Sequence, residues 1–194
     1  METVLALAVA LVLGLKHATD PDHLVAVSSL VLTDEGDVRA AVRLGAWWGL
    51  GHAAVLVLVG VPLIAFKEEM PAWLESGAET AVGVVIVLLA VRVIVRWLRP
   101  EDQSAVRTPH QALGIGMLHG LAGTGAVVLL LVAATPDPLE AAATLAVFAP
   151  MSIVSMALCT SAFAWALTRG ELYRTVLVPV LGGLGLLFGL WYVL

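Results

Sequence analysis

The segment GLKHATDPDHLVAVSS, residues 14–29, concentrates groups that bind metal ions or move protons. His17 and His23 enclose two acidic residues, Asp20 and Asp22. Neutral imidazoles with a carboxylate, and without sulfur, favour Ni(II), Co(II), Zn(II) or Fe(II) over Cu(I) and over the all-oxygen sites of Mg(II) and Ca(II). The pattern therefore predicts a site for a transition-metal ion, although ligand type does not choose among the four.

The rest of the sequence is that of an integral membrane protein. Hydrophobic residues make up 60% of the chain and charged residues 13%, and the mean hydropathy is +0.99. A soluble domain normally carries about twice that charged fraction. No basic patch suggests a nucleic-acid partner, and the single cysteine, Cys159, excludes a disulfide framework and a thiolate metal cage. The expected partners are the lipid bilayer and a divalent metal ion.

Six apolar runs are long enough to cross a bilayer, which predicts an all-α, polytopic fold with six transmembrane helices in one domain, residues 1–194. Charged and turn-forming residues separate the runs. The first run lacks the basic start and the small-residue cleavage site of a signal peptide, so we expect it to remain as a span. The runs are residues 3–32, 41–66, 78–98, 110–134, 139–168 and 172–194.

The basic residues predict how the chain lies across the membrane. Every arginine falls in or beside the first, third and fifth connections, whereas the other side holds only Lys67. Because positive residues mark the cytoplasmic side, we expect these connections in the cytoplasm and both termini outside. The arginines are Arg39, Arg43, Arg92, Arg96, Arg99, Arg107, Arg169 and Arg174.

A faint repeat relates residues 1–100 to residues 101–194. GLKHATDPDHLVAV aligns with GMLHGLAGTGAVVL, and both contain G-x-x-H. Three spans per half would invert one half relative to the other, as in transporters whose site lies at the repeat interface. Helices rich in Gly, Leu and Val can also resemble one another by chance.

Four of the five histidines lie deep in the apolar runs. At about 1.5 Å per residue, His17, His23, His52 and His119 are roughly 14–20 Å from an end of their runs, near mid-membrane. We expect His110 at the surface. A single buried histidine is commonly satisfied by a carbonyl group, but several ionisable residues at one depth favour a metal or proton site.

Pro21 predicts a break in the first span. On a straight helix His17 and His23 point about 120° apart, so both could not reach one ion. Proline removes a helical hydrogen bond and clashes with the preceding turn, which predicts a kink or an unwound segment at residues 18–22. Ring nitrogens and freed carbonyl groups can then line one cavity, as in the broken helices of transporters.

Further residues are expected to support the site or the packing. Lys16 and Asp20 would pair on a regular helix and leave Asp22 available as a ligand. Small residues such as Gly51 and Gly120 let helices approach closely, and Trp47 and Trp48 are expected as interfacial or packing aromatics. The expected metal ligands are His17, Asp22, His23, His52 and His119, and the expected supporting residues are Lys16, Asp20, Pro21 and Thr124.

These motifs resemble those of the nickel/cobalt permease family. KHATDPDH is similar to the family signature, a histidine, four residues and Asp-His after a basic residue, at Lys16, His17, Asp22 and His23. The segments GAWWGLGHAAVL, MLHGLAGTGAV and FAPMSIVSMALCTSAF resemble further family motifs. The resemblance covers nearly the whole chain and is strongest to the short, six-span urease-accessory (UreH-type) members.

The resemblance implies uptake of Ni(II) or Co(II) across the cytoplasmic membrane of a bacterium or archaeon, with the first motif essential. The ion would be cargo, with no resident cofactor, and Zn(II) or Fe(II) are further candidates by ligand type. Export of the same ions, a metal sensor and an accessory subunit are the alternatives. An intramembrane metalloenzyme is disfavoured because the chain lacks a His-Glu-x-x-His motif to activate water.

Overall fold

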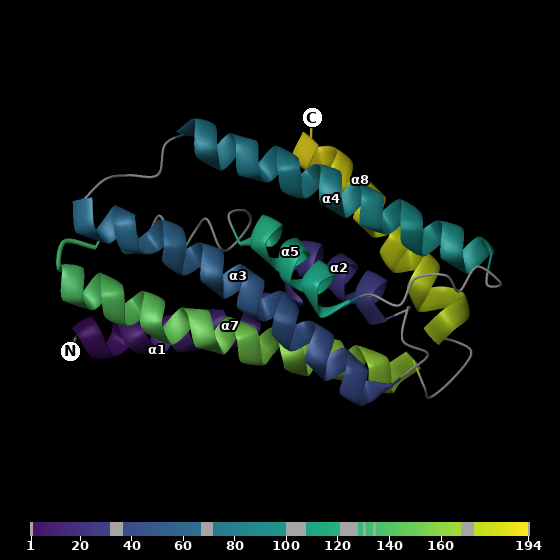
Figure 1. Ribbon diagram of the computed structural model, residues 1–194, viewed down its shortest axis with the longest axis horizontal. Coiled ribbons are helices and arrows are strands. Elements are labelled where there is room, and N and C mark those ends of the chain that lie inside the picture. Colours follow the sequence, from purple (N-terminus) through teal and green to yellow (C-terminus); the bar gives the residue numbers. More distant parts are fainter. Residues whose placement is uncertain are drawn as a thin grey trace.

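A computed structural model shows a bundle of helices, with no strand in the part of the chain that it describes (Figure 1). The structure describes residues 2–31, 37–66, 72–99, 108–120, 128–129, 131–133, 135–167 and 173–193. For these residues the expected all-α fold is confirmed.

The first apolar run is divided by a break. α1, Glu2–Lys16, leads into a single 3₁₀ turn, η1, His17–Thr19, and α2 follows as Pro21–Val31. Asp20 has an extended backbone (φ −67°, ψ 149°), which a residue before proline favours for steric reasons. Proline suits the first position of α2 because N–H groups of a first turn have no helical partner. The two arms bend by 51°, so the expected break is confirmed.

The other helices follow the remaining apolar runs. α5 begins with a capping box in which the Thr108 hydroxyl accepts from the Gln111 backbone N–H, and the Gln111 side chain accepts from the Thr108 backbone N–H. The helices are α3 (Val38–Phe66), α4 (Ala72–Leu98), α5 (Pro109–His119), α7 (Pro138–Leu167) and α8 (Val178–Val193), the last preceded by a π-helical turn, η2 (Tyr173–Leu177).

Among the residues that the structure describes, three helical segments are long and apolar enough to cross a membrane, Val38–Phe66, Pro138–Ala166 and Thr175–Val193. α1 and α2 add a fourth if the bent pair forms one span. α5 has 11 residues, about 16 Å of helix against a hydrocarbon core of about 30 Å. The described residues therefore support a membrane protein, but the six-span count and the inverted halves are not confirmed.

α2, the second arm of the broken span, lies between two groups of helices (Figure 1). α3 packs on α7, which also contacts α1, and α5 packs on α3. α4 pairs with α8. Because α2 contacts α7 as well as α4 and α8, it joins the two groups, and the break stands where they meet.

α3 and α5 approach until their backbones touch. A Cβ atom on Gly116 would overlap the carbonyl group of Trp48 and lie 3.0 Å from the backbone nitrogen of His52. A Cβ on Gly51 would overlap a carbonyl group of α5, and one on Gly120 would lie 2.8 Å from the His52 carbonyl oxygen. Gly51 and Gly120 therefore have the packing role expected of them, and the crossing determines where α5 stands relative to His52.

Candidate metal centre

Five ionisable side chains from three parts of the chain meet at the break. His17 lies in η1, Asp22 and His23 lie in the first turn of α2, His52 lies in the middle of α3, and His119 ends α5. Each residue is at most 3% exposed. Ionisable groups withdrawn this far from solvent require a partner or a bound ion.

Three of the imidazoles come close enough to share one ion. The Nε2 atoms of His17 and His52 are 2.8 Å apart, and the ring centroids of His17 and His23 are 4.3 Å apart. One ligand atom from each of the three lies within 4.8 Å of the other two. Two nitrogens bound to one ion at about 2.0–2.1 Å are separated by roughly 3 Å, so small side-chain shifts would complete a three-nitrogen site.

Asp22 brings a carboxylate to the same place. Its Oδ1 lies 3.0 Å from Nδ1 of His23, and its Oδ2 has no hydrogen-bond partner among the described residues. Ligand atoms of Asp20, Asp22 and His23 form a second group within 4.8 Å of one another. Asp20 is half-buried, and its Oδ2 lies 3.8 Å from Nδ1 of His17. His23 thus belongs to both groups, and Asp20 is the more exposed of the two aspartates.

His119 lies beside the three histidines. Its ring centroid is 5.5 Å from that of His23. Its Nδ1 is 3.2 Å from the carbonyl oxygen of Ile115, and because a carbonyl only accepts, Nδ1 must carry the proton. Nε2 then offers a lone pair, and it is buried with no hydrogen-bond partner in the described part of the chain. The ring is therefore suited to bind a cation through Nε2.

Two aromatic side chains close the site against solvent. Trp48 is fully buried, with its ring 5.3 Å from that of His23 and 6.0 Å from that of His119. Phe148 of α7 stacks edge-on against His17, with ring centroids 5.3 Å apart. An apolar shell of this kind lowers the local dielectric and so strengthens the attraction between a cation and its ligands.

α7 stabilises the break through side chains that sequence analysis did not assign to the site. The Ser155 hydroxyl donates to the Leu15 carbonyl oxygen at 2.6 Å and accepts from the Ala18 backbone N–H at 3.3 Å. The Cys159 thiol donates to the Ala18 carbonyl oxygen at 3.5 Å. Backbone groups at the break thus have partners on α7. The signal available in the sequence was the i, i+4 spacing of the serine and the cysteine, which places both on one face of an apolar helix.

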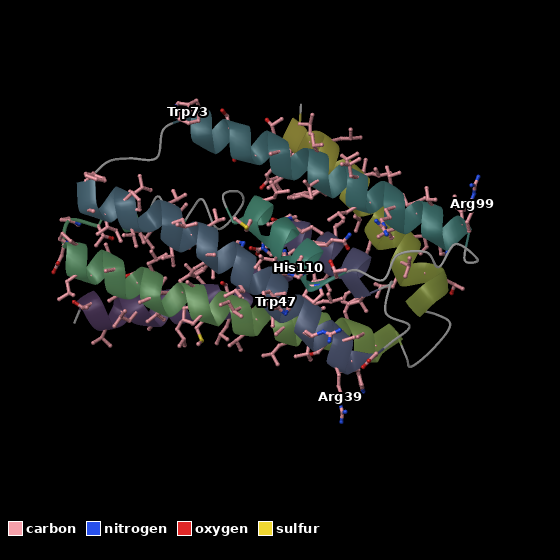
Figure 2. The ribbon with its side chains drawn as sticks, in the orientation of Figure 1. Arg39, Trp47, Trp73, Arg99 and His110 are labelled. Atoms are coloured by element: carbon pink, nitrogen blue, oxygen red, sulfur yellow. The ribbon has the colours of Figure 1, made fainter. Side chains whose placement is uncertain are left out.

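The remaining expected residues lie around the site. Lys16 is exposed, and the 3₁₀ turn between it and Asp20 removes the regular helix on which their pairing was predicted. Thr124 lies outside the described residues. His110 is exposed as expected, and its ring stacks on that of Trp47 with centroids 6.4 Å apart (Figure 2).

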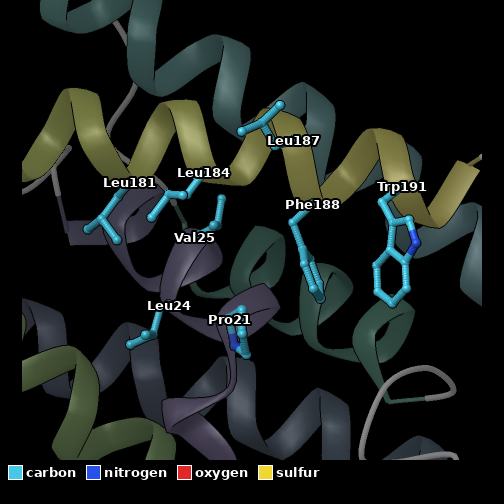
Figure 3. Close-up of a pocket in the computed structure, with 8 residues that line it drawn as sticks. All are labelled: Pro21, Leu24, Val25, Leu181, Leu184, Leu187, Phe188 and Trp191. Atoms are coloured by element: carbon cyan, nitrogen blue, oxygen red, sulfur yellow. The ribbon is translucent and has the colours of Figure 1, made fainter.

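A groove beside the break provides no metal ligand. It has a volume of about 540 Å³ and runs between α2 and α8 from Pro21 to Trp191 (Figure 3). Its other lining residues, such as Leu24 and Phe188, are apolar. The surface toward the groove is therefore apolar, whereas the rings of His17 and His23 lie against side chains of α3, α5 and α7.

Comparison with known proteins gives two kinds of match. A family model described as NicO, high-affinity nickel-transport protein, matches residues 3–108, which include His17, His23 and His52. The chain is 27% identical over 204 residues to the urease accessory protein UreH of Bacillus sp. (strain TB-90), covering 96% of this chain and 89% of that protein. It is 37% identical over 78 residues to the high-affinity nickel transport protein of Cupriavidus necator, covering 40% of this chain and 22% of that protein. No solved structure matches the chain.

Proposed function

The chain belongs to the family of high-affinity nickel-transport proteins (NicO), and on this premise we propose that it is a permease that carries Ni(II), and also Co(II), into the cell across the cytoplasmic membrane of a prokaryote. The observation that carries the proposal is the convergence of His17, His23 and His52 with Asp22 inside a bundle of apolar helices. Ionisable residues within a membrane are costly to bury and commonly mark ion pathways or proton relays.

Each group has a role suited to a cargo ion. The three imidazoles replace water ligands, and the Asp22 carboxylate offsets part of the dication's charge in a region of low dielectric. His119 serves as a further ligand or as the next position of the moving ion, since its Nε2 is buried within the same cluster. Asp20 supports His17, and Pro21 maintains the break that presents the ligands.

The helix packing supports movement of one helix group against the other. If the halves are inverted repeats, α3 corresponds to α7 and α4 to α8, and these corresponding helices pair with each other. In Figure 1 the chain also passes through α5 in the direction opposite to α1 and α2. We propose that the α4–α8 pair moves against the group of α1, α3 and α7, with the ion held at the break between them.

The arginine distribution supports the orientation with both termini outside. Arg39 and Arg99 lie toward one end of the bundle, away from Trp73 (Figure 2). Positive residues mark the cytoplasmic side, so this end would face the cell interior.

Cells that produce the chain are expected to accumulate more nickel and cobalt than cells that carry the empty vector. Accumulation is measured by elemental analysis at submicromolar external nickel, with Zn(II) or Fe(II) added as competitors to rank the ions. If cells that produce the chain held less metal and resisted it better than cells with the empty vector, the chain would export the ions and not take them up. Unchanged content and unchanged resistance would contradict a permease and favour a sensor or an accessory subunit.

Replacement of His119 by alanine is expected to raise the nickel concentration for half-maximal uptake by about tenfold. The change removes a buried ring nitrogen next to His23, and loss of a group that supports a metal ligand commonly lowers affinity by about 10- to 100-fold. His110→Ala is the matched control, because that histidine belongs to the same helix but is exposed. If both variants needed the same nickel concentration for half-maximal uptake, His119 would not belong to the ion pathway.

A further inference from the structure

The break in the first span is connected to α7 on both sides of His17. The Ser155 hydroxyl donates a hydrogen bond to the carbonyl oxygen of Leu15, two residues before the histidine. It accepts one from the backbone N–H of Ala18, directly after the histidine. These contacts join residues far apart in the sequence, and Ser155 is itself buried, with 5% of its surface exposed. The backbone that carries the His17 ring is therefore held from a different helix.

We propose that Ser155 is a positioning residue of the metal site, which holds the broken turn so that His17 faces His52. The inference rests on the proposed transport function, since it concerns the same ligands. Ser155 does not touch the ion. It acts through the backbone of the turn, and the turn carries the ligand.

The distances explain why the turn requires such support. The Nε2 atoms of His17 and His52 are 2.8 Å apart, and a coordination site tolerates errors of only about 0.5 Å in its ligands. A 3₁₀ turn followed by an extended residue has few hydrogen bonds of its own, and the bilayer interior offers no water to replace those that are missing. Without the hydroxyl, the Leu15 carbonyl and the Ala18 N–H would lose these partners, and the backbone on both sides of His17 would be held less firmly against α7.

The close packing of α1 on α7 places the hydroxyl accurately. A Cβ atom on Gly14 would lie 2.6 Å from Cβ of Met151, one turn before Ser155 on α7. The two helices are thus in contact directly before the break. Cys159, one turn after the serine, adds a weaker bond to the Ala18 carbonyl oxygen.

α7 contains a matched control. Ser152 is fully buried, and its hydroxyl donates to the Ala149 carbonyl oxygen within α7 itself, at 2.8 Å. Ser152→Ala and Ser155→Ala therefore remove the same group from the same helix at similar burial. Only the second removes a contact with the turn.

The experiment measures nickel uptake in cells and thermal unfolding of the purified full-length chain, with and without nickel. Ser155→Ala is expected to raise the half-saturating nickel concentration about tenfold with little change in maximal rate, and to reduce the nickel-induced rise in the unfolding midpoint. Ser155→Thr, which keeps a hydroxyl, is expected to recover most of the affinity. Cys159→Ala should have a smaller effect than Ser155→Ala, and Ser152→Ala should leave the affinity within twofold of wild type.

If Ser155 only stabilised the fold, both serine variants would lower the unfolding midpoint of the metal-free protein equally, and nickel affinity would be unchanged. That result, or an equal loss of affinity in Ser152→Ala, would overturn the inference while the transport function stands. A wild-type chain with neither nickel uptake nor a nickel-induced shift would overturn the proposed function, and the inference with it.

Discussion

His23→Ala is expected to abolish nickel accumulation, with the largest effect of any single side-chain truncation in the site. His23 is fully buried and is the member shared by the two candidate ligand groups. Its ring lies 4.3 Å from that of His17 and 5.5 Å from those of His52 and His119. Loss of a supporting group outside the ligands already lowers metal affinity by about 10- to 100-fold, so loss of this ring should lower it by more than about 100-fold.

The measurement is cellular nickel content at an external concentration near half-saturation for the wild type. Immunoblotting of membranes confirms that the variant is present in equal amount, and His110→Ala serves as the histidine control. A His23→Ala variant that reached the membrane and accumulated nickel normally would place the ion pathway elsewhere in the chain.

The break was predictable because its cause is local. Proline at position 21 disfavours a regular helix in the preceding turn, and two histidines that a straight helix would point apart require such a break to meet. The burial of His52 and His119 also followed from sequence, because both lie in the middle of apolar runs. These expectations depend on one residue or one run at a time.

Relationships between helices were not predictable in the same way. Trp47 and Trp48 are adjacent and were both expected as interfacial or packing aromatics, yet Trp48 is fully buried against the histidines while Trp47 is 38% exposed. Which of the two faces inward depends on how α3 is rotated toward α5. Likewise, the bonds of Ser155 to the break depend on the register of α7 against α1, which no local pattern encodes.

The length of α5 was also not predictable from the sequence. The apolar run from residue 110 to residue 134 predicts one span. In the described residues α5 ends at His119 and Gly120 forms a turn, and because residues 121–127 lie outside the described part, the span stays a prediction. Hydropathy records only that this part of the chain is apolar, and an apolar segment inside a bundle does not have to be a continuous helix.

Gly116→Ala is expected to separate α3 from α5 and so damage both stability and the metal site. The added methyl group would overlap the Trp48 carbonyl and crowd the backbone nitrogen of His52, and neither atom can move as a side-chain tip could. Overpacking of a core typically costs about 1–3 kcal/mol, and contact with backbone places this change toward the upper end. Because Trp48 and His52 would be displaced together from His119, nickel affinity should also fall.

Gly114→Ala is the control for Gly116→Ala, and it is expected to change stability in the opposite direction. This glycine lies on the same helix, and a Cβ atom there would meet no atom within 4 Å. Alanine exceeds glycine in helix propensity by up to ~1 kcal/mol, so Gly114→Ala should unfold at an equal or higher temperature, with unchanged nickel uptake. The measurement is the unfolding midpoint of each purified variant beside its uptake in cells. Equal behaviour of the two variants would show that the helix crossing does not position the histidines, since only position 116 stands at the contact.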